Sequence, residues 1–297
     1  MPEPGAAAAS LFVALRQANV AYDSGDWQSA EQACARVLAA HPENVAALNL
    51  LGIICAQTRR SADAEQLFAR ALAVTPTDAV VHNNHGNVLM GLGRLREAGE
   101  SYQRALALRP HDAETHYNLG VILQQTGRVG EALGSYARAL AIQPGYAEAA
   151  YNQGMALQEL RRLEDALHSY TAAIRVRPAF AEAYNNRGNT LSELGQLEAA
   201  LQDFTRALQI NPRLAEAHVN SGHALVALRR PVEAAASYAQ ALAIVPGRPW
   251  LPGASVYARL QACAWADLDS QLAGLSAAIG AGDQAVVPFT TLACSDS

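Results

Sequence analysis

Residues 113–146 read AETHYNLGVILQQTGRVGEALGSYARALAIQPGY, and most of the chain repeats the pattern of this stretch. Apolar residues recur at spacings of three, four and seven on both sides of Gly127, which is typical of amphipathic helices. Gly127 stands where a left-handed residue commonly ends a helix, and the ring of Pro144 cannot continue the hydrogen-bond ladder of a second helix. The stretch therefore predicts a helix, a turn and another helix.

The same landmarks return every 34 residues along the chain, in seven units. Each unit ends on a proline: Pro42, Pro76, Pro110, Pro144, Pro178, Pro212 and Pro246. Six units carry a glycine in the first helix: Gly52, Gly86, Gly120, Gly154, Gly188 and Gly222. The second helix of the same units carries an aromatic residue: Phe68, Tyr102, Tyr136, Tyr170, Phe204 and Tyr238. The turn holds glycine at residues 25, 93, 127 and 195, and arginine at residues 59, 161 and 229.

These small and large positions indicate how the helices pack. A glycine at the crossing point lets the two helices approach closely, and the aromatic residue fills the space that is left. One hairpin cannot bury its apolar face alone, whereas stacked copies can. The sequence therefore predicts an all-α solenoid in which each repeat contacts its neighbours.

Over residues 11–246 the chain resembles a tetratricopeptide repeat array, whose period is 34 residues. The resemblance implies a right-handed α-α superhelix whose first helices line the concave surface. The tryptophan that often opens this repeat is replaced by other residues: Leu48, His82, His116, Ala150, Tyr184 and His218. The first unit has Ala18 and Cys34 in place of the glycine and the aromatic residue, which suits a capping repeat.

Composition excludes several kinds of partner. The net charge is −5 and all 22 basic residues are arginine, so a broad surface for nucleic acid or an anionic membrane is not expected. Residues 1–10 form a tail without a basic residue, and no apolar stretch is long enough to span a membrane. The four cysteines have no metal or disulfide spacing. We expect a cytoplasmic protein without a cofactor or a metal.

One row of polar residues lies on the predicted first helices, two positions before the glycine. It comprises Asn84, Asn118, Asn152, Asn186 and Asn220. An amide both donates and accepts hydrogen bonds, so a ladder of amides is able to hold the main chain of an extended polypeptide. The alternative is that these side chains satisfy helix termini or face water. The repeat arrays of protein O-linked N-acetylglucosamine transferases carry such a ladder, and the resemblance implies the peptide-binding role.

A second row, in the turn after each first helix, is basic: Arg60, Arg94, Arg128, Arg162 and Arg230. We favour a structural role, because cations near a helix C-terminus offset the helix dipole and bond the free carbonyls. A basic edge for an acidic partner is the alternative. His82, His116 and His218 share the slot of the missing tryptophan and are expected to be packing residues, and Cys34 and Cys55 are expected in the core.

The repeat stops after Pro246, where residues 247–297 begin. Helical periodicity in residues 254–263 and 267–279 predicts a capping helix pair, and residues 286–294 predict an extended segment. This part resembles the stretch that follows the repeats in O-linked N-acetylglucosamine transferase-like and Spindly-type glycosyltransferases. The matching residues are Tyr257 to Asp269 apart from Ala264, then Gly282, Val287 to Phe289 and Leu292 to Asp296. In that family they lead into two catalytic lobes, so we expect a fragment or a chain that has lost its catalytic half.

Three classes of function compete. The leading one is an interaction module that binds extended polypeptides and recruits them to such a glycosyltransferase; the alternative is a stand-alone scaffold or adaptor. An enzyme complete in these residues is not supported, because no set of acid, base or nucleophile motifs is found. A chain without lysine also lacks the lysine and asparagine clamp of chaperone-binding repeat domains. Pairing of two copies into a homo-oligomer stays open.

Overall fold

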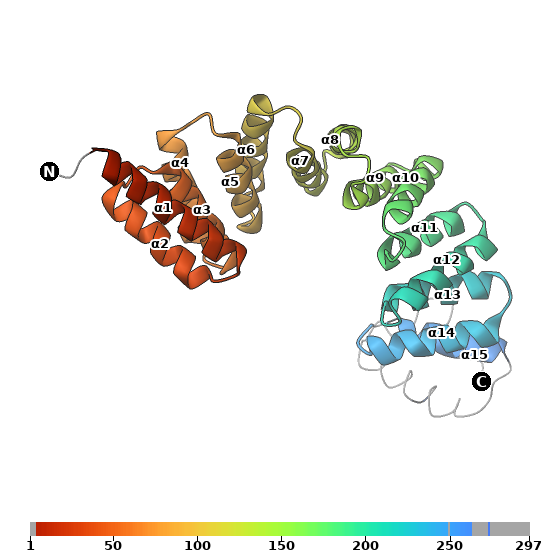
Figure 1. Cartoon of the computed structure of the whole chain (residues 1–297). Coiled ribbons are helices and arrows are strands. Elements are labelled where there is room, and N and C mark those ends of the chain that lie inside the picture. The colour runs from red at the N-terminus through yellow and green to blue at the C-terminus, as the bar shows by residue number, and fades with distance from the viewer. Residues whose placement is uncertain (1–3, 249, 263–272, 274–297) are drawn as a thin grey trace. The chain divides into compact units, whose positions relative to one another are not determined.

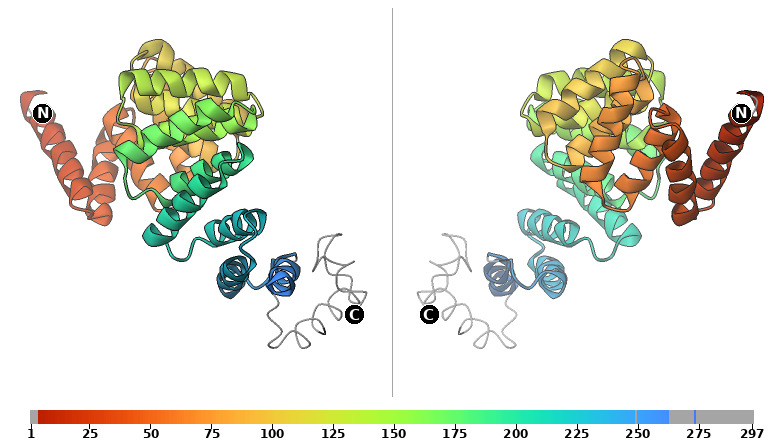
Figure 2. Two further views of the ribbon diagram at one scale, coloured as in Figure 1. Left: turned by 90° about the vertical axis from the view of Figure 1, so that its right-hand side faces the viewer. Right: turned by 90° about the vertical axis from the view of Figure 1, so that its left-hand side faces the viewer.

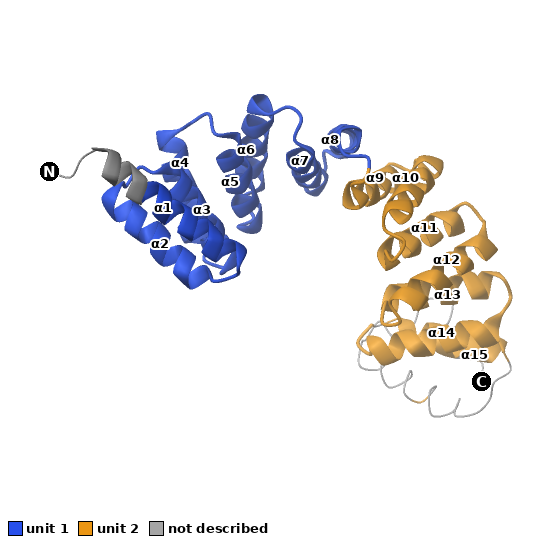
Figure 3. Cartoon of the chain, in the orientation of Figure 1, with its two compact units in different colours: residues 1–144 blue, residues 145–297 orange. Residues whose placement is uncertain are grey.

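The computed structural model describes residues 4–248, 250–262 and 273, and all regular secondary structure in this part of the chain is helical (Figure 1). The chain divides into two compact units, residues 1–144 and residues 145–297 (Figure 3). The all-α solenoid class that the repeat predicts is confirmed. Each unit is a stack of helical hairpins whose two helices run antiparallel, as two further views show (Figure 2).

The first unit contains four hairpins. Their helices are α1 (Pro4–Asp23) and α2 (Trp27–Ala40), α3 (Val45–Gln57) and α4 (Ser61–Val74), α5 (Ala79–Gly91) and α6 (Leu95–Leu108), and α7 (Ala113–Gln125) and α8 (Val129–Ile142). Each second helix also packs on the first helix of the next hairpin, as α4 does on α5 and α6 on α7. Successive first helices contact one another as well, so α3, α5 and α7 share one face of the unit.

The described part of the second unit contains three hairpins and one further helix. The helices are α9 (Ala147–Glu159) and α10 (Leu163–Val176), α11 (Ala181–Glu193) and α12 (Leu197–Ile210), α13 (Ala215–Ala227) and α14 (Pro231–Ile244), and α15 (Leu251–Gln261). Here too α9 contacts α11 and α11 contacts α13, while α15 covers α14. The first helices again share a face.

The close crossing of the two helices in a hairpin is the feature that fixes the fold. In α7 a methyl group on Gly120 would lie 2.6 Å from a ring carbon of Tyr136 in α8, and the other five crossing glycines have the same relation to their aromatic residue. Tyr136 is fully buried. Only glycine leaves room for the ring, so the packing predicted from the small and large positions is confirmed.

The turn between the two helices requires a left-handed backbone. Glycine supplies it in four hairpins, with φ between 73° and 79°. Arg59, Arg161 and Arg229 adopt the same conformation, with φ of 63°, 61° and 56°. An L-residue with a side chain pays a steric penalty in this region, so these three turns are strained where the glycine turns are not.

Two predicted boundaries differ from the structure. Helix α1 begins at Pro4, so residues 4–10 extend the first helix although they were predicted as tail; the run of alanine in this segment has the highest intrinsic helix propensity. The first capping helix spans Leu251–Gln261 and starts before residue 254, because it admits a proline in its first turn. The second capping helix, the extended segment and most of the glycosyltransferase-like motif lie outside the described residues.

Cys34 and Cys55 lie in the core as predicted. Burial raises the pKa of the Cys34 thiol to about 11. Because the thiolate is the reactive form, both side chains act here as small apolar residues.

Candidate functional site

The predicted asparagine row occupies one position on successive first helices. Within the first unit it comprises Asn84 of α5 and Asn118 of α7, and within the second unit Asn152 of α9, Asn186 of α11 and Asn220 of α13. Asn118 is buried and the others are half-buried. We call the helix face that carries these residues the ladder face of each unit.

In the first unit the row links neighbouring hairpins. Asn84 donates from Nδ2 to Oδ1 of Asn49 in α3 at 2.9 Å. Asn118 donates from Nδ2 to Oδ1 of Asn87 in α5 at 3.0 Å, and the hydroxyl of Tyr102 donates to the same oxygen at 2.7 Å. Each asparagine of this unit therefore bonds to the first helix that precedes its own.

In the second unit the row forms a relay across three first helices. Asn220 donates to Oδ1 of Asn185 at 2.9 Å, Asn185 donates to Oδ1 of Asn186 at 3.2 Å, and Asn186 donates to the hydroxyl of Tyr151 at 2.9 Å. Asn152 also has an interaction partner. Four of the ladder residues therefore connect repeats, namely Asn84, Asn118, Asn186 and Asn220. The sequence pattern did not predict this role, for which helix termini and water were the alternatives.

The internal bonds use only part of each amide. Asparagine carries two N–H groups and one carbonyl oxygen with two lone pairs. Asn84, Asn118 and Asn220 each use one N–H group, and no donor among the described residues bonds to their Oδ1 atoms. The ladder face thus keeps free acceptors as well as remaining donors.

The second unit has an open cleft of about 310 Å³ on its ladder face. Its lining includes Gln158 of α9, Asn189, Ser192 and Glu193 of α11, and Asn220 and His223 of α13. The predicted ladder residue Asn220 is thus part of a larger polar site. The other members were missed, although Asn189, Ser192 and Glu193 are spaced by three and four residues and therefore share one helix face.

Glu193 is the acidic member of this cleft. Its carboxylate accepts a hydrogen bond from Nε2 of Gln158 at 2.7 Å and forms an ion pair with Arg161 in the turn after α9. The neighbouring Ser192 hydroxyl is buried and has no hydrogen-bond partner in the part of the chain that the structure describes. His223 stacks on Trp250 with ring centroids 5.5 Å apart, which fixes the plane of its imidazole at the edge of the cleft.

Two clefts larger than that of the ladder face lie on the other side of the hairpins, between successive second helices. One of about 740 Å³ lies between α6 and α8, and one of about 930 Å³ lies between α12 and α14. Their linings contain none of the five ladder asparagines. Volume alone therefore does not single out the ladder face; the recurrence of one amide at one position does.

Polar pairs also join the two helices within single hairpins. The residue before the crossing glycine is leucine at residues 51 and 119, but it is polar in the other four hairpins: His85, Gln153, Arg187 and Ser221. Gln153 accepts a hydrogen bond from Ser169 at 3.1 Å, and Arg187 forms two hydrogen bonds of 2.7 Å with Asp203. These pairs were missed, and the departure from leucine was the signal in the sequence.

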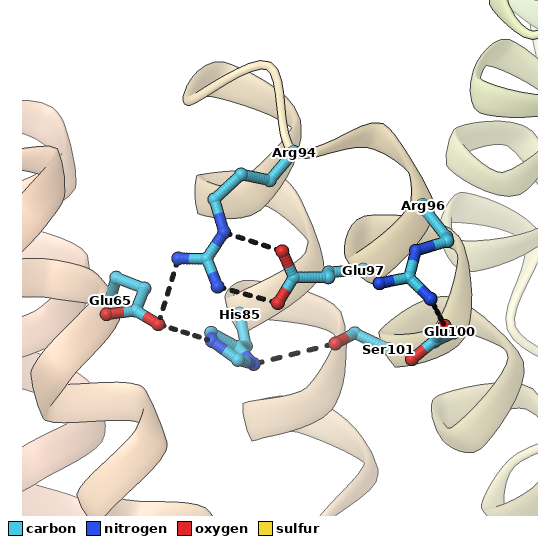
Figure 4. A network of polar contacts seen from close by, with 7 residues as sticks. All are labelled: Glu65, His85, Arg94, Arg96, Glu97, Glu100 and Ser101. Atoms are coloured by element: carbon cyan, nitrogen blue, oxygen red, sulfur yellow. Dashed lines mark hydrogen bonds and ion pairs between the residues drawn. The ribbon is translucent and has the colours of Figure 1, made fainter.

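His85 belongs to a larger network (Figure 4). Its Nε2 lies 3.8 Å from Oε1 of Glu65 in α4, and its Nδ1 lies 3.5 Å from Oγ of Ser101 in α6. Arg94 bridges Glu65 and Glu97 at 3.2 Å and 2.6 Å. Burial lowers the pKa of His85, against the opposing effect of Glu65. The network ties three helices of the first unit together.

The arginine row is structural, as favoured from the sequence, but it forms ion pairs and does not bond the free carbonyls of a helix end. These residues precede the second helices, and their partners are carboxylates where helix carbonyls were expected. Arg94, Arg128 and Arg230 each pair with the glutamate three residues later at 2.6 Å, and Arg60 pairs with Glu31 at 2.7 Å. Arg162 pairs with Asp165, also three residues later, at 2.6 Å.

The histidines in the tryptophan slot are packing residues with a polar anchor. Nε2 of His82 lies 2.9 Å from the carbonyl of Pro76, and His116 and His218 make the same contact at 3.0 Å with Pro110 and Pro212. Because a carbonyl oxygen only accepts, Nε2 carries the proton. The contact ties the start of a first helix to the end of the hairpin before it.

Three models of the tetratricopeptide repeat match the chain, over residues 15–79 and 83–147, over residues 156–195 and over residues 181–214. Together the matched residues make up more than half of the chain. No curated protein matches it.

Several solved structures are similar. A tetratricopeptide repeat protein from Parabacteroides merdae has 18% identity and a TM-score of 0.60, with 84% of this chain and 98% of that chain covered. PilF of Pseudomonas aeruginosa has 20% identity and a TM-score of 0.61, with 68% and 92% covered. YrrB, described as a TPR protein with an unusual peptide-binding site, has 23% identity and a TM-score of 0.56, with 63% and 96% covered. These likenesses show the fold.

None of the helices in the described part of the chain is both long and apolar enough to cross a membrane.

Proposed function

The chain belongs to the tetratricopeptide repeat family, whose stacked hairpins present extended surfaces to protein partners, and from this premise we propose that its ladder face binds an extended polypeptide. The observation that carries the proposal is the asparagine at one position of five successive first helices, with a polar cleft on the same face of the second unit.

The free atoms of the ladder suit a main chain. Oδ1 of Asn84, Asn118 and Asn220 accepts peptide N–H groups, and the second N–H of each amide donates to a peptide carbonyl. Asn189 in the cleft of the second unit has no partner among the described residues, so its whole amide serves a ligand. Main-chain contacts give affinity without strong sequence preference. The peptide-binding site named for YrrB, a protein of the same fold, supports this proposal.

Footprinting tests which face binds. Met155 occupies the place in α9 that Asn189 and His223 occupy in α11 and α13. We expect a mixture of short unstructured peptides to protect Met155 and His223 from hydroxyl radicals. His168, exposed on the second helix α10, should keep its reactivity.

A matched pair of variants tests the role of the free amide. Asn189→Ala should weaken peptide binding about fivefold, which corresponds to one hydrogen bond of about 1 kcal/mol. Gln202→Ala, on α12 in the cleft between second helices, should leave binding unchanged. Protection of His168, or loss of affinity in Gln202→Ala alone, would place binding on the other side of the hairpins.

A finer proposal is that the bound polypeptide is presented to a glycosyltransferase. It is supported by the sequence motif from Tyr257 onward, of which residues 257–262 form the described end of α15 and its cap. Reading the gene beyond the codon for Ser297 tests it. Continuation into a two-lobed catalytic domain supports recruitment to an enzyme, and a stop codon there supports the stand-alone scaffold.

A further inference from the structure

The charged side chains on the first helices of the second unit are mostly acidic. α9, α11 and α13 contain five glutamates and one arginine, Arg187. Arg187 is occupied, because Asp203 of α12 holds it through two hydrogen bonds of 2.7 Å. Three of the glutamates pair with arginines that lie outside the first helices: Glu148 with Arg177, Glu193 with Arg161 and Glu216 with Arg248. The first helices themselves therefore supply carboxylates and neutral amides.

The cleft at the end of this face presents acceptors to a ligand. Asn220 has one N–H group committed to Asn185, while no donor among the residues that the structure describes bonds to its Oδ1. The buried Oγ of Ser192 has no hydrogen-bond partner among the described residues. With the carboxylate of Glu193 at the end of α11, three kinds of oxygen line a space of about 310 Å³ that has no arginine in its lining.

An arginine of this chain already pairs with the carboxylate of Glu193. The guanidinium of Arg161 pairs with Glu193 from the turn after α9. The Arg161 side chain is 71% exposed, and its residue holds a left-handed backbone conformation that disfavours a side chain. Arg161 is thus a weakly held internal cation that competes for Glu193 with any ligand cation.

From these contacts we infer that the cleft lined by Gln158, Asn189, Ser192, Glu193, Asn220 and His223 takes the guanidinium or ammonium group of an arginine or lysine residue in the bound polypeptide. This rests on the proposed function. The cation pairs with Glu193 and donates its remaining N–H groups to the free oxygens of Ser192 and Asn220, and the ladder amides hold the main chain beside it. An anionic side chain meets no arginine in the lining of the cleft and is repelled by Glu193, whose charge Arg161 offsets from the turn after α9.

The experiment uses two short unstructured peptides of the same sequence, except that each arginine in the first is citrulline in the second. Citrulline keeps the shape and loses the charge. Wild-type protein should bind the arginine peptide about threefold more tightly than the citrulline peptide, a ratio typical of one partly exposed ion pair. High salt should abolish that ratio.

Three variants assign the effect. Glu193→Gln should bring the ratio to about one. Arg161→Gly should raise the ratio, because it removes the internal competitor and places glycine at φ 61°. A merely structural role for the Arg161–Glu193 pair predicts the opposite, a loss of binding in Arg161→Gly. Glu164→Gln, on the second helix α10 and outside the cleft, is the matched control and should keep the wild-type ratio.

The outcomes separate the two proposals. If both peptides bind equally to wild type and both weaken in Asn189→Ala, the ladder binds polypeptides and the cation site is refuted. If neither peptide binds, the proposed function fails. A ratio that persists in Glu193→Gln would place the cation elsewhere on the protein and overturn this inference.

Discussion

Arg187 and Asp203 join α11 to α12 through two parallel hydrogen bonds of 2.7 Å, and Asp203 is only 6% exposed. Removing one partner of a buried pair leaves the other charge without compensation. We expect Asp203→Ala to lower the free energy of unfolding by about 3 kcal/mol, measured by urea denaturation followed by circular dichroism.

The repeats themselves provide the control for this pair. At the matching positions the α7–α8 hairpin has Leu119 and Ser135. The double variant Arg187→Leu with Asp203→Ser should therefore unfold within about 1 kcal/mol of the wild type, because no charge is left unpaired. A double variant as unstable as Asp203→Ala would show that the charges themselves, and not their pairing, stabilise the hairpin.

The crossing glycines make a second prediction. Gly120→Ala places a methyl group 2.6 Å from the ring of Tyr136, so the helices must separate or the ring must turn. We expect a loss of about 1 to 3 kcal/mol in the free energy of unfolding. Gly134→Ala in α8 meets nothing within 4 Å and should gain about 0.5 to 1 kcal/mol from helix propensity. Equal effects of the two substitutions would contradict the close-crossing explanation.

The strained turns, in which arginine holds a left-handed backbone, make a third prediction. Arg59→Gly and Arg229→Gly should each raise the free energy of unfolding by about 1 kcal/mol, because glycine adopts positive φ without a steric penalty. The reverse change at the same place in another hairpin, Gly93→Arg, should lower it by a similar amount. Thermal unfolding of the three variants checks both signs, and a stabilised Gly93→Arg would remove backbone strain as the cause.

His85 predicts a pH dependence. Burial lowers its pKa, so the unfolded chain, with a histidine pKa of about 6.5, binds the proton more readily than the folded chain. The contribution of neutral His85 to stability is therefore present above about pH 6.5 and lost as the pH falls below it. The control is His85→Leu, which places at this position the leucine found at residues 51 and 119. The polar groups around the histidine stay in place in this variant; they are Glu65, Arg94, Glu97, Ser101 and His82. The melting temperature of this variant should fall less than that of the wild type between about pH 8 and about pH 5; an equal fall in both would assign the acid sensitivity to other groups.

The hairpins were predictable from sequence because glycine, aromatic residue and proline return at a fixed period, and close packing allows few other residues in those places. The hydrogen bonds that the ladder asparagines make to neighbouring repeats were not predictable from the sequence. Asn186 bonds to Tyr151 and Asn220 bonds to Asn185, each 35 residues earlier, and the identity of the partner changes from repeat to repeat. Such pairs become visible only once the register between successive first helices is known. The cleft likewise needs side chains from α9, α11 and α13 together.

The relay of the second unit makes the last prediction, and it concerns cooperativity between repeats. Asn220→Ala removes the donor to Asn185, and Asn186→Ala removes both the acceptor of Asn185 and the donor to Tyr151. Each single substitution should cost about 1 kcal/mol of unfolding free energy. Because Asn185 bonds to both residues, the double variant should cost less than the sum, with a coupling of about 0.5 kcal/mol or more. Asn118→Ala in the first unit, combined with Asn220→Ala, is the matched control and should be additive, since the two residues share no partner. Additivity in the α11–α13 pair would mean that the bonds act singly and that the ladder does not couple one hairpin to the next.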